Sequence, residues 1–242
     1  MGLKALVKRW LRRAGVDVQR YVPQTSDAAK LARLFATYQV DCVFDVGANV
    51  GQYVEWLRGL GYGGRVVSFE PLTAVYSQLL SRKRDDDMWV VAPRMALGDF
   101  DGLSEINVSE NLASSSLLRM QDAHFRAAPT SRVVGREQVE VRRLDSVFSQ
   151  WVGAARRPFL KMDTQGYEAH VLRGAGDCLR HFVGVQAELS LCELYREQEL
   201  FFDVSNRLRS SGFNLVGLFP AFADNKTGRL LQVDGVFFRT EA

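Results

Sequence analysis

Cysteine is scarce in this chain of 242 residues, and long apolar runs are lacking. Its three cysteines, Cys42, Cys178 and Cys192, are far apart and form no CxxC pair, which argues against a disulfide framework and a zinc site. The three cysteines are best interpreted as buried, reduced thiols of a cytoplasmic protein. No run approaches the roughly 18 apolar residues of a membrane span, and the basic start is not followed by the apolar run of a signal peptide. We therefore expect a cytoplasmic protein.

A large excess of one charge is also lacking. The 31 basic and 28 acidic residues leave a formal net charge of +3, which is too small to indicate a nucleic-acid partner. The hydrophobic content of 47% is ordinary for a globular protein with a full core. The length fits one domain, or one domain with a small appendage.

Residues 3–14 differ from the rest of the chain. Apolar residues recur there at helical spacing, with Trp10 among them, and five lysines and arginines are interleaved. The pattern predicts a short, basic, amphipathic helix. Two interpretations stay open: the helix lies on an anionic surface at the inner face of a membrane, or it packs on its own domain or on a second subunit of a homo-oligomer.

Strands and helices alternate along the remainder. The patterns predict helices at 26–38, 53–60, 73–84, 166–172 and 200–210, strands at 40–46, 65–69, 89–95, 159–162, 183–189, 214–219 and 235–239, and extended pieces at 104–108 and 138–141. This alternation is typical of a parallel sheet covered on both faces. We expect an α/β fold with a mostly parallel seven-stranded sheet, helices on both faces and an antiparallel edge hairpin formed by the last two strands.

The segment of residues 109–135 fits neither a helical nor a strand pattern. It is rich in Ser, Ala, Arg and Gln, and a loop of this length inside a compact domain is usually functional or disordered. We interpret it as a lid-like insertion that recognises the substrate, and call it the lid segment. The expected organisation is a pair of N-terminal helices in residues 1–38 and one domain in residues 39–242.

The most informative stretch, residues 43–51, reads VFDVGANVG. It predicts a buried strand that ends in a turn, in which Gly47 and Gly51 leave room for a ligand and Asn49 adds a polar group. The spacing is not the GxGxxG of dinucleotide folds, and Asp45 would repel a pyrophosphate. An acid there suits S-adenosyl-methionine, whose ammonium and sulfonium groups are cationic, so we expect Asp45 to bind the ammonium group directly or through water.

A second buried strand ends in Glu70, about twenty residues later. An acid at this place can accept hydrogen bonds from both ribose hydroxyls of an adenosine cofactor. After the third strand, Ala96 and Leu97 are expected to offer an apolar surface and a backbone amide to the adenine. The alternatives are a helix-capping turn without a nucleotide, and a simple tight turn at residues 99–102.

Residues 160–168, LKMDTQGYE, form the second informative run. Lys161 is charged within an apolar strand and needs a partner. Asp163 follows this strand and Glu188 lies at the same end of the next one, at the sheet edge where ligands bind in open α/β sheets. The two acids can act as a general base for a hydroxyl or hold a hard divalent cation. Each can equally cap a helix or pair with Lys161 or an arginine.

His124 lies in the lid segment and is the third catalytic candidate. An imidazole has the right pKa for a base at neutral pH. A lone histidine in a polar loop is more often simply solvated, so this alternative also stays open.

As an ordered set, several motifs resemble the FkbM-type methyltransferase family. They are DVGANVG at 45–51, FEP at 69–71, ALGD at 96–99, SSSL at 114–117, LD at 144–145 and LKMDTQGYE at 160–168. The likeness covers roughly residues 43–238. It implies a Rossmann-like class I methyltransferase that uses S-adenosyl-methionine and methylates hydroxyls of sugars and polyketide-type natural products.

The resemblance also implies a metal, since related sugar methyltransferases hold magnesium with acids that correspond by position to Asp163 and Glu188. One departure concerns Gln165, where the family usually has Glu; the change weakens the case for a carboxylate metal site. With Tyr167, this variant is similar to members that act on deoxysugars of bacterial glycolipids. A glycolipid acceptor would agree with a membrane-surface role for residues 3–14.

The sequence thus predicts transfer of a methyl group from S-adenosyl-methionine to a hydroxyl, of a sugar in a glycolipid or glycosylated natural product. Two other functions stay open. The first is a nicotinamide-dependent oxidoreductase, against which the turn spacing and Asp45 argue. The second is a cofactor-binding scaffold without catalysis, against which the combination of Asp45, Glu70 and Asp163 argues.

Overall fold

The computed structural model describes residues 3–16, 22, 24, 26–83 and 85–239. Its helices are α1 (Leu3–Arg13), α2 (Asp27–Thr37), α3 (Gln52–Gly59), α4 (Thr73–Lys83), α5 (Asp122–Ala127), η1 (Pro129–Ser131), α6 (Leu144–Val152), α7 (Glu168–Ala175), η2 (Gly176–His181) and α8 (Phe201–Ser210). Its strands are β1 (Cys42–Val46), β2 (Arg65–Phe69), β3 (Trp89–Val91), β4 (Ala96–Gly98), β5 (Gly102–Ser109), β6 (Val133–Arg143), β7 (Pro158–Met162), β8 (Gly184–Ser190), β9 (Phe213–Ala223) and β10 (Leu230–Arg239).

The main sheet has seven strands in the order β3-β2-β1-β7-β8-β10-β9. Strand β1 is parallel to β2 and β7 on its two sides, and β8 continues the parallel part beside β7. Strand β10 runs antiparallel to both β8 and β9. The expected mostly parallel seven-stranded sheet, with its antiparallel edge hairpin, is confirmed.

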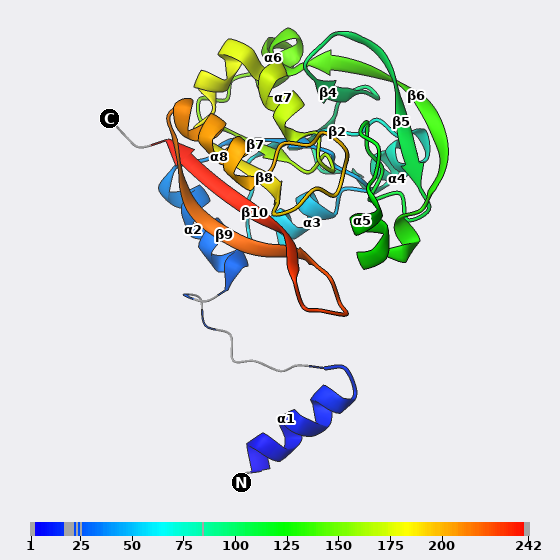
Figure 1. Ribbon diagram of the computed structural model, residues 1–242. Helices are drawn as coiled ribbons and strands as arrows, with labels where there is room; N and C mark the ends of the chain where they lie inside the picture. Colours follow the sequence, from blue (N-terminus) through cyan, green and yellow to red (C-terminus); the bar gives the residue numbers. More distant parts are fainter. Residues whose placement is uncertain (1–2, 17–21, 23, 25, 84, 240–242) are drawn as a thin grey trace.

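Helices cover both faces of this sheet, with α6, α7 and α8 on one side and α2 and α3 on the other (Figure 1). The alternation of side chains along a strand divides the core in the same way. On β1, Phe44 and Val46 pack with residues of α6, α7 and α8, whereas Val43 packs with residues of α2, α3 and α4. Asp45 is on the same side of the strand as Val43.

A second sheet of three strands, β4-β6-β5, was expected only as extended pieces. The third strand of the main sheet ends at Val91 rather than at Met95, and residues 96–98 pair with β6 instead. Strand β5 pairs along its whole length with β6, from Gly102 opposite Val141 to Ser109 opposite Val133. The lid segment is therefore shorter and more ordered than its sequence indicates, because β6 takes over its last residues and α5 and η1 form within it.

The two helices expected in residues 1–38 are α1 and α2, although residues 1–2, 17–21, 23 and 25 lie outside the described part of the chain. Ser26 caps α2, since its Oγ accepts a hydrogen bond from Ala29 N at 3.3 Å. Leu31 and Phe35 bury the apolar side of α2 against the sheet. Within the described ranges, no helix has the length and apolar character needed to cross a membrane.

Candidate functional site

A pocket lies at the carboxyl ends of β1, β2 and β7, where open α/β sheets bind their ligands. Its lining comes from the turns that follow these strands, the start of β4 and part of the lid segment. Five residues expected to bind a cofactor are in this lining: Gly47, Asn49, Glu70, Ala96 and Leu97. Asp163 from the end of β7 lines the same pocket, so the expected cofactor and acceptor groups come together here.

The turn after β1 owes its shape to two glycines with different roles. Gly47 has φ +75°, and a Cβ there would lie 1.9 Å from the carbonyl oxygen of Asp163, so only glycine lets the turns after β1 and β7 approach. Gly51 has φ +91°, and a Cβ there would lie 2.4 Å from the ring of Trp89. Gly51 does not line the pocket, so its role is packing against Trp89 and not the room for a ligand that its sequence position suggests.

Glu70 lines the pocket, and two backbone hydrogen bonds hold its carboxylate in place. Asn49 N donates to Oε2 and Leu72 N donates to Oε1, both at 2.9 Å. Burial raises the pKa of Glu70 to about 7, even though these two hydrogen bonds favour the charged form; the nearby charge of Asp45 raises it further. Each oxygen keeps a second lone pair, so Glu70 can accept two hydroxyl groups.

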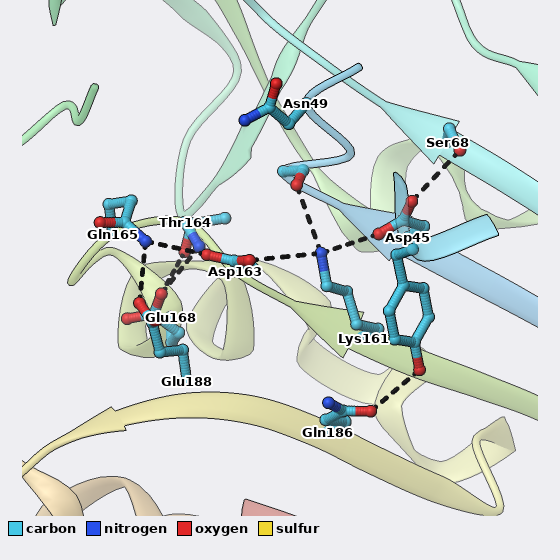
Figure 2. A network of polar contacts seen from close by, with 12 residues as sticks. Asp45, Asn49, Ser68, Lys161, Asp163, Thr164, Gln165, Glu168, Gln186 and Glu188 are labelled. Atoms are coloured by element: carbon cyan, nitrogen blue, oxygen red, sulfur yellow. Dashed lines mark hydrogen bonds and ion pairs between the residues drawn. The ribbon is translucent and has the colours of Figure 1, made fainter. Parts of the chain in front are cut away.

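Asp45 lies beneath the pocket and does not line it. Its side chain is fully buried, with Lys161 Nζ 3.0 Å from Oδ1 and Ser68 Oγ donating to Oδ2 at 3.4 Å (Figure 2). The three residues are register partners on β1, β2 and β7, so they project from the same face of the sheet. The carboxylate of Asp45 is thus paired with Lys161 and lies outside the pocket lining, and binding of a cofactor ammonium group by Asp45 stays a prediction.

Lys161 connects this buried acid to the pocket. Its Nζ donates to the carbonyl oxygen of Gly47 at 3.3 Å and lies 3.7 Å from Oδ2 of Asp163 (Figure 2). The ring of Tyr53 covers it, with the ring centroid 5.1 Å from Nζ. Burial by itself would lower the pKa of Lys161, but the charges of Asp45 and then Asp163 outweigh it and raise the pKa above its usual value. The two neighbouring acids therefore favour the charged form of Lys161.

The two acids expected to act on the acceptor are joined by an amide. Nε2 of Gln165 donates to Oδ1 of Asp163 and to Oε2 of Glu188, each at 2.9 Å (Figure 2). Gln232 donates a second hydrogen bond to Oε2 of Glu188 at 2.7 Å. Burial raises the pKa of Glu188 well above its ordinary value, and Asp163 adds to this by repulsion. Asp163 is 43% exposed, so it is the member of the pair open to a ligand.

These residues, as arranged, do not fit a magnesium ion. Magnesium takes oxygen ligands in octahedral geometry, whereas an N–H donor of Gln165 stands between the two carboxylates. The amide oxygen of Gln165 is turned away and accepts from the hydroxyl of Tyr195 at 2.9 Å. Among the residues that the structure describes, no three His, Cys, Asp or Glu side chains gather as a metal site.

Two residues that support the turn after β7 were missed by sequence reasoning. Oε1 of Glu168 accepts from Thr164 N at 2.8 Å and from Gly166 N at 3.3 Å, and burial raises the pKa of Glu168 to about 7. Its place in the first turn of α7 was a readable signal for such a role. The single hydroxyl proton of Tyr195 is shared between the amide oxygen of Gln165 at 2.9 Å and the carbonyl oxygen of Ser114 at 3.0 Å, but nothing in the local sequence around Tyr195 predicts this.

Residues 112–113 and 115–117 of the lid segment form one wall of the pocket. Ser116 Oγ anchors this wall by donating to the carbonyl oxygen of Gln165 at 2.8 Å. Leu112 has φ +58°, a conformation that is costly for a side chain of this size. Five non-glycine residues of the described chain have positive φ, and three of them, Asn49, Leu112 and Gln165, line this one pocket. Such clustered strain is typical of functional sites.

His124, the third catalytic candidate, is placed away from the pocket lining. It is neither solvated nor available as a base, because its side chain is 3% exposed and packs between the rings of Tyr195 and Phe222. Within the described structure, its Nδ1 has no hydrogen-bond partner. Burial lowers the pKa of His124 to about 4, so the ring is neutral at physiological pH. The sequence did not predict this burial of His124, because the lid segment has a polar composition.

The sequence pattern of the methyltransferase FkbM domain family matches residues 45–215. No curated protein matches the chain significantly. A fibrillarin pre-rRNA processing protein from Methanococcus jannaschii has 11% identity, with 84% of this chain and 68% of that chain covered and a TM-score of 0.48.

Two further solved structures, both with bound S-adenosyl-methionine, are also similar. The fibrillarin of Aeropyrum pernix has 12% identity and a TM-score of 0.45, over 81% of this chain and 66% of its own length, which is just under two thirds. The magnesium protoporphyrin IX methyltransferase of Synechocystis PCC 6803 has 10% identity and a TM-score of 0.45, over 99% of this chain and 98% of that one.

Proposed function

The chain belongs to the methyltransferase FkbM domain family, and from this premise we propose that it transfers the methyl group of S-adenosyl-methionine to a hydroxyl of a sugar, in a glycolipid or a glycosylated natural product. The observation that carries the proposal is the pocket at the carboxyl ends of the strands, where Glu70 and Asp163 line one cavity. Glu70 can accept hydrogen bonds from the ribose of the cofactor, and Asp163 can accept one from the acceptor hydroxyl.

The lining fits the cofactor. When bound, S-adenosyl-methionine supplies a methyl group on a sulfonium, which is an electrophile without further activation. Glu70 would accept the ribose hydroxyls, and Ala96 and Leu97 would offer an apolar surface to the adenine. The turn at Gly47 exposes backbone at the pocket wall, and Lys161 holds this turn through the Gly47 carbonyl oxygen.

Asp163 is the residue that we assign to the acceptor hydroxyl. Asp163 would accept the proton of this hydroxyl, and bound S-adenosyl-methionine would supply the methyl group to its oxygen and leave as S-adenosyl-homocysteine. A positioned base of this kind contributes roughly 10²- to 10⁴-fold, and holding the oxygen in line contributes more. Gln165 fixes the carboxylate in place, and no step passes through a metal.

The groups around Asp163 support a polyhydroxyl acceptor. Glu188 and Gln232 lie next to it through the Gln165 amide, so carboxylate and amide groups gather at this edge of the sheet. Carboxylates accept hydrogen bonds and amides both donate and accept them, so together these groups can bind neighbouring sugar hydroxyls, each of which is both a donor and an acceptor.

The test is calorimetric titration of the protein with S-adenosyl-homocysteine, with and without magnesium chloride, followed by product analysis with S-adenosyl-methionine. We expect micromolar binding, no dependence of that binding on magnesium, and a methyl ether when deoxysugar glycolipids or natural-product glycosides are offered. Folded protein that binds no S-adenosyl-homocysteine, or binds reduced nicotinamide instead, would overturn the proposal. Methylation at nitrogen would overturn the hydroxyl assignment.

Affinity for S-adenosyl-homocysteine should depend on pH through Glu70. The raised pKa of about 7 means that the free protein carries a protonated Glu70 below this pH, and the ribose hydroxyls need the carboxylate as acceptor. Binding therefore releases a proton at low pH, and the affinity falls as pH decreases from about 8 to about 6. Calorimetry in buffers of different ionisation enthalpy measures this release directly.

The matched variant is Glu70→Gln, which keeps the size and removes the titration. We expect it to bind S-adenosyl-homocysteine roughly 10- to 100-fold more weakly, with a flat pH dependence, because charge-assisted hydrogen bonds are lost. A wild-type affinity that stays constant across this pH range would contradict the role of Glu70.

A further inference from the structure

Helix α1 leaves its apolar side uncovered. Leu6, Val7 and Trp10 are 47%, 50% and 72% exposed, and the helix stands away from the sheet and its covering helices (Figure 1). The next helix behaves differently, since Leu31 and Phe35 of α2 are 1% and 4% exposed. Of the two interpretations that the sequence left open, packing of α1 on its own domain is therefore not what the structure shows.

The charge of α1 has one sign only. The helix reads LKALVKRWLRR, with basic residues on every turn and no acid. At about 100° per residue, the apolar residues Leu6, Val7, Trp10 and Leu11 fall within an arc of roughly 140°, and Lys8, Arg9, Arg12 and Arg13 occupy the rest of the surface. An apolar face bordered by cations on both sides complements a surface that is apolar inside and anionic outside.

We propose that α1 binds the surface of an anionic membrane, lying in the plane of the interface. Its apolar side enters the boundary between headgroups and acyl chains, Trp10 occupies the depth that tryptophan prefers, and the lysines and arginines contact lipid phosphates. An isolated helix of this length is marginal in water, so the membrane surface also stabilises its helical form. The proposal rests on α1 alone and does not require the proposed methyl transfer.

Other kinds of partner would account for either the charge or the exposed apolar side of α1, but not for both. A nucleic acid would satisfy the cations but would leave Leu6, Val7 and Trp10 in water. A second copy of α1 would cover the apolar face but would bring two wholly basic helices together, which repel each other. An anionic lipid surface satisfies both features with one partner.

The experiment is sedimentation of the full chain with vesicles of phosphatidylcholine, alone or mixed with phosphatidylglycerol. We expect binding to the anionic vesicles that weakens with added salt, and little binding to phosphatidylcholine alone. Trp10→Ala should lower the partition coefficient roughly tenfold. The double variant Lys8→Gln with Arg9→Gln should lower it roughly 10- to 30-fold at low salt.

The matched control is Phe202→Ala. Phe202 lies on α8 and, at 75% exposure, is as open as Trp10, so its removal tests whether any exposed aromatic residue gives the same effect. We expect its binding to equal that of the wild type, and we expect the tryptophan emission to shift to the blue on vesicle addition in Phe202→Ala but not in Trp10→Ala.

Three outcomes would overturn the proposal. The first is wild-type protein that ignores anionic vesicles. The second is an equal loss of binding in the Phe202→Ala control. The third is a dimer in solution that Trp10→Ala dissociates, which would assign the apolar side of α1 to a second copy of the chain.

Discussion

Replacing Asp163 by asparagine is expected to lower methyl-transfer turnover by roughly 10²- to 10⁴-fold, because the base that takes the hydroxyl proton is lost. Asparagine keeps the shape of the side chain, and its oxygen can still accept the hydrogen bond that Gln165 donates at 2.9 Å. The affinity for S-adenosyl-homocysteine should therefore stay within a few-fold of the wild type. Asp163→Ala, which also removes this hydrogen bond, should abolish turnover.

The measurement is turnover with S-adenosyl-methionine and an accepted sugar substrate, beside calorimetry with S-adenosyl-homocysteine. Asp177→Asn is the matched control, because Asp177 is an exposed acid on η2, next to the amino ends of the parallel strands and away from the pocket. The assignment fails if Asp163→Asn turns over like the control, or if its loss of turnover is explained entirely by lost cofactor affinity.

Replacing Lys161 by methionine is expected to reduce the free energy of unfolding by about 3–5 kcal/mol, because it leaves a buried acid without its partner. Methionine fills a similar volume, so the loss reports the uncompensated charge of Asp45 and not a cavity. The change also removes the hydrogen bond to the Gly47 carbonyl oxygen, so the turn at the cofactor pocket loosens and S-adenosyl-homocysteine binds more weakly.

Urea unfolding of the wild type, Lys161→Met and the double variant with Asp45→Asn measures this effect. The double variant should regain part of the loss, because the two residues in contact are coupled. Lys30→Met is the control, since the pair of Lys30 and Asp27 is exposed and such surface pairs are worth about 1 kcal/mol or less. A loss in Lys161→Met no larger than in Lys30→Met would contradict the structural role of this buried pair.

This buried pair gives the site its rigidity. Asp45 and Lys161 lie side by side on neighbouring strands, and Lys161 reaches both the turn at Gly47 and the carboxylate of Asp163. The proposed cofactor side and acceptor side of the pocket therefore share one fixed cation. A site whose supporting residues are held in this way loses less to reorganisation when the ligand binds.

The sequence by itself determined the sheet and the position of the pocket. Hydrophobic periodicity and turn residues are local signals, so the alternating strands and helices, the turn at Gly47 and the acid Glu70 were all readable along the chain. Asp163 was placed correctly at the pocket because it directly follows a buried strand, and parallel strands end at the same edge of a sheet.

Only the tertiary structure decided what each polar side chain touches. The partner of Asp45 follows from the register of β1 and β7, which joins residues more than a hundred positions apart, and strand alternation then turns Asp45 away from the pocket toward Lys161. Gln165 separates Asp163 from Glu188, and Tyr195 orients Gln165, through contacts of the same long range. Such contacts depend on packing between distant segments, so the local sequence around each residue does not predict its partner.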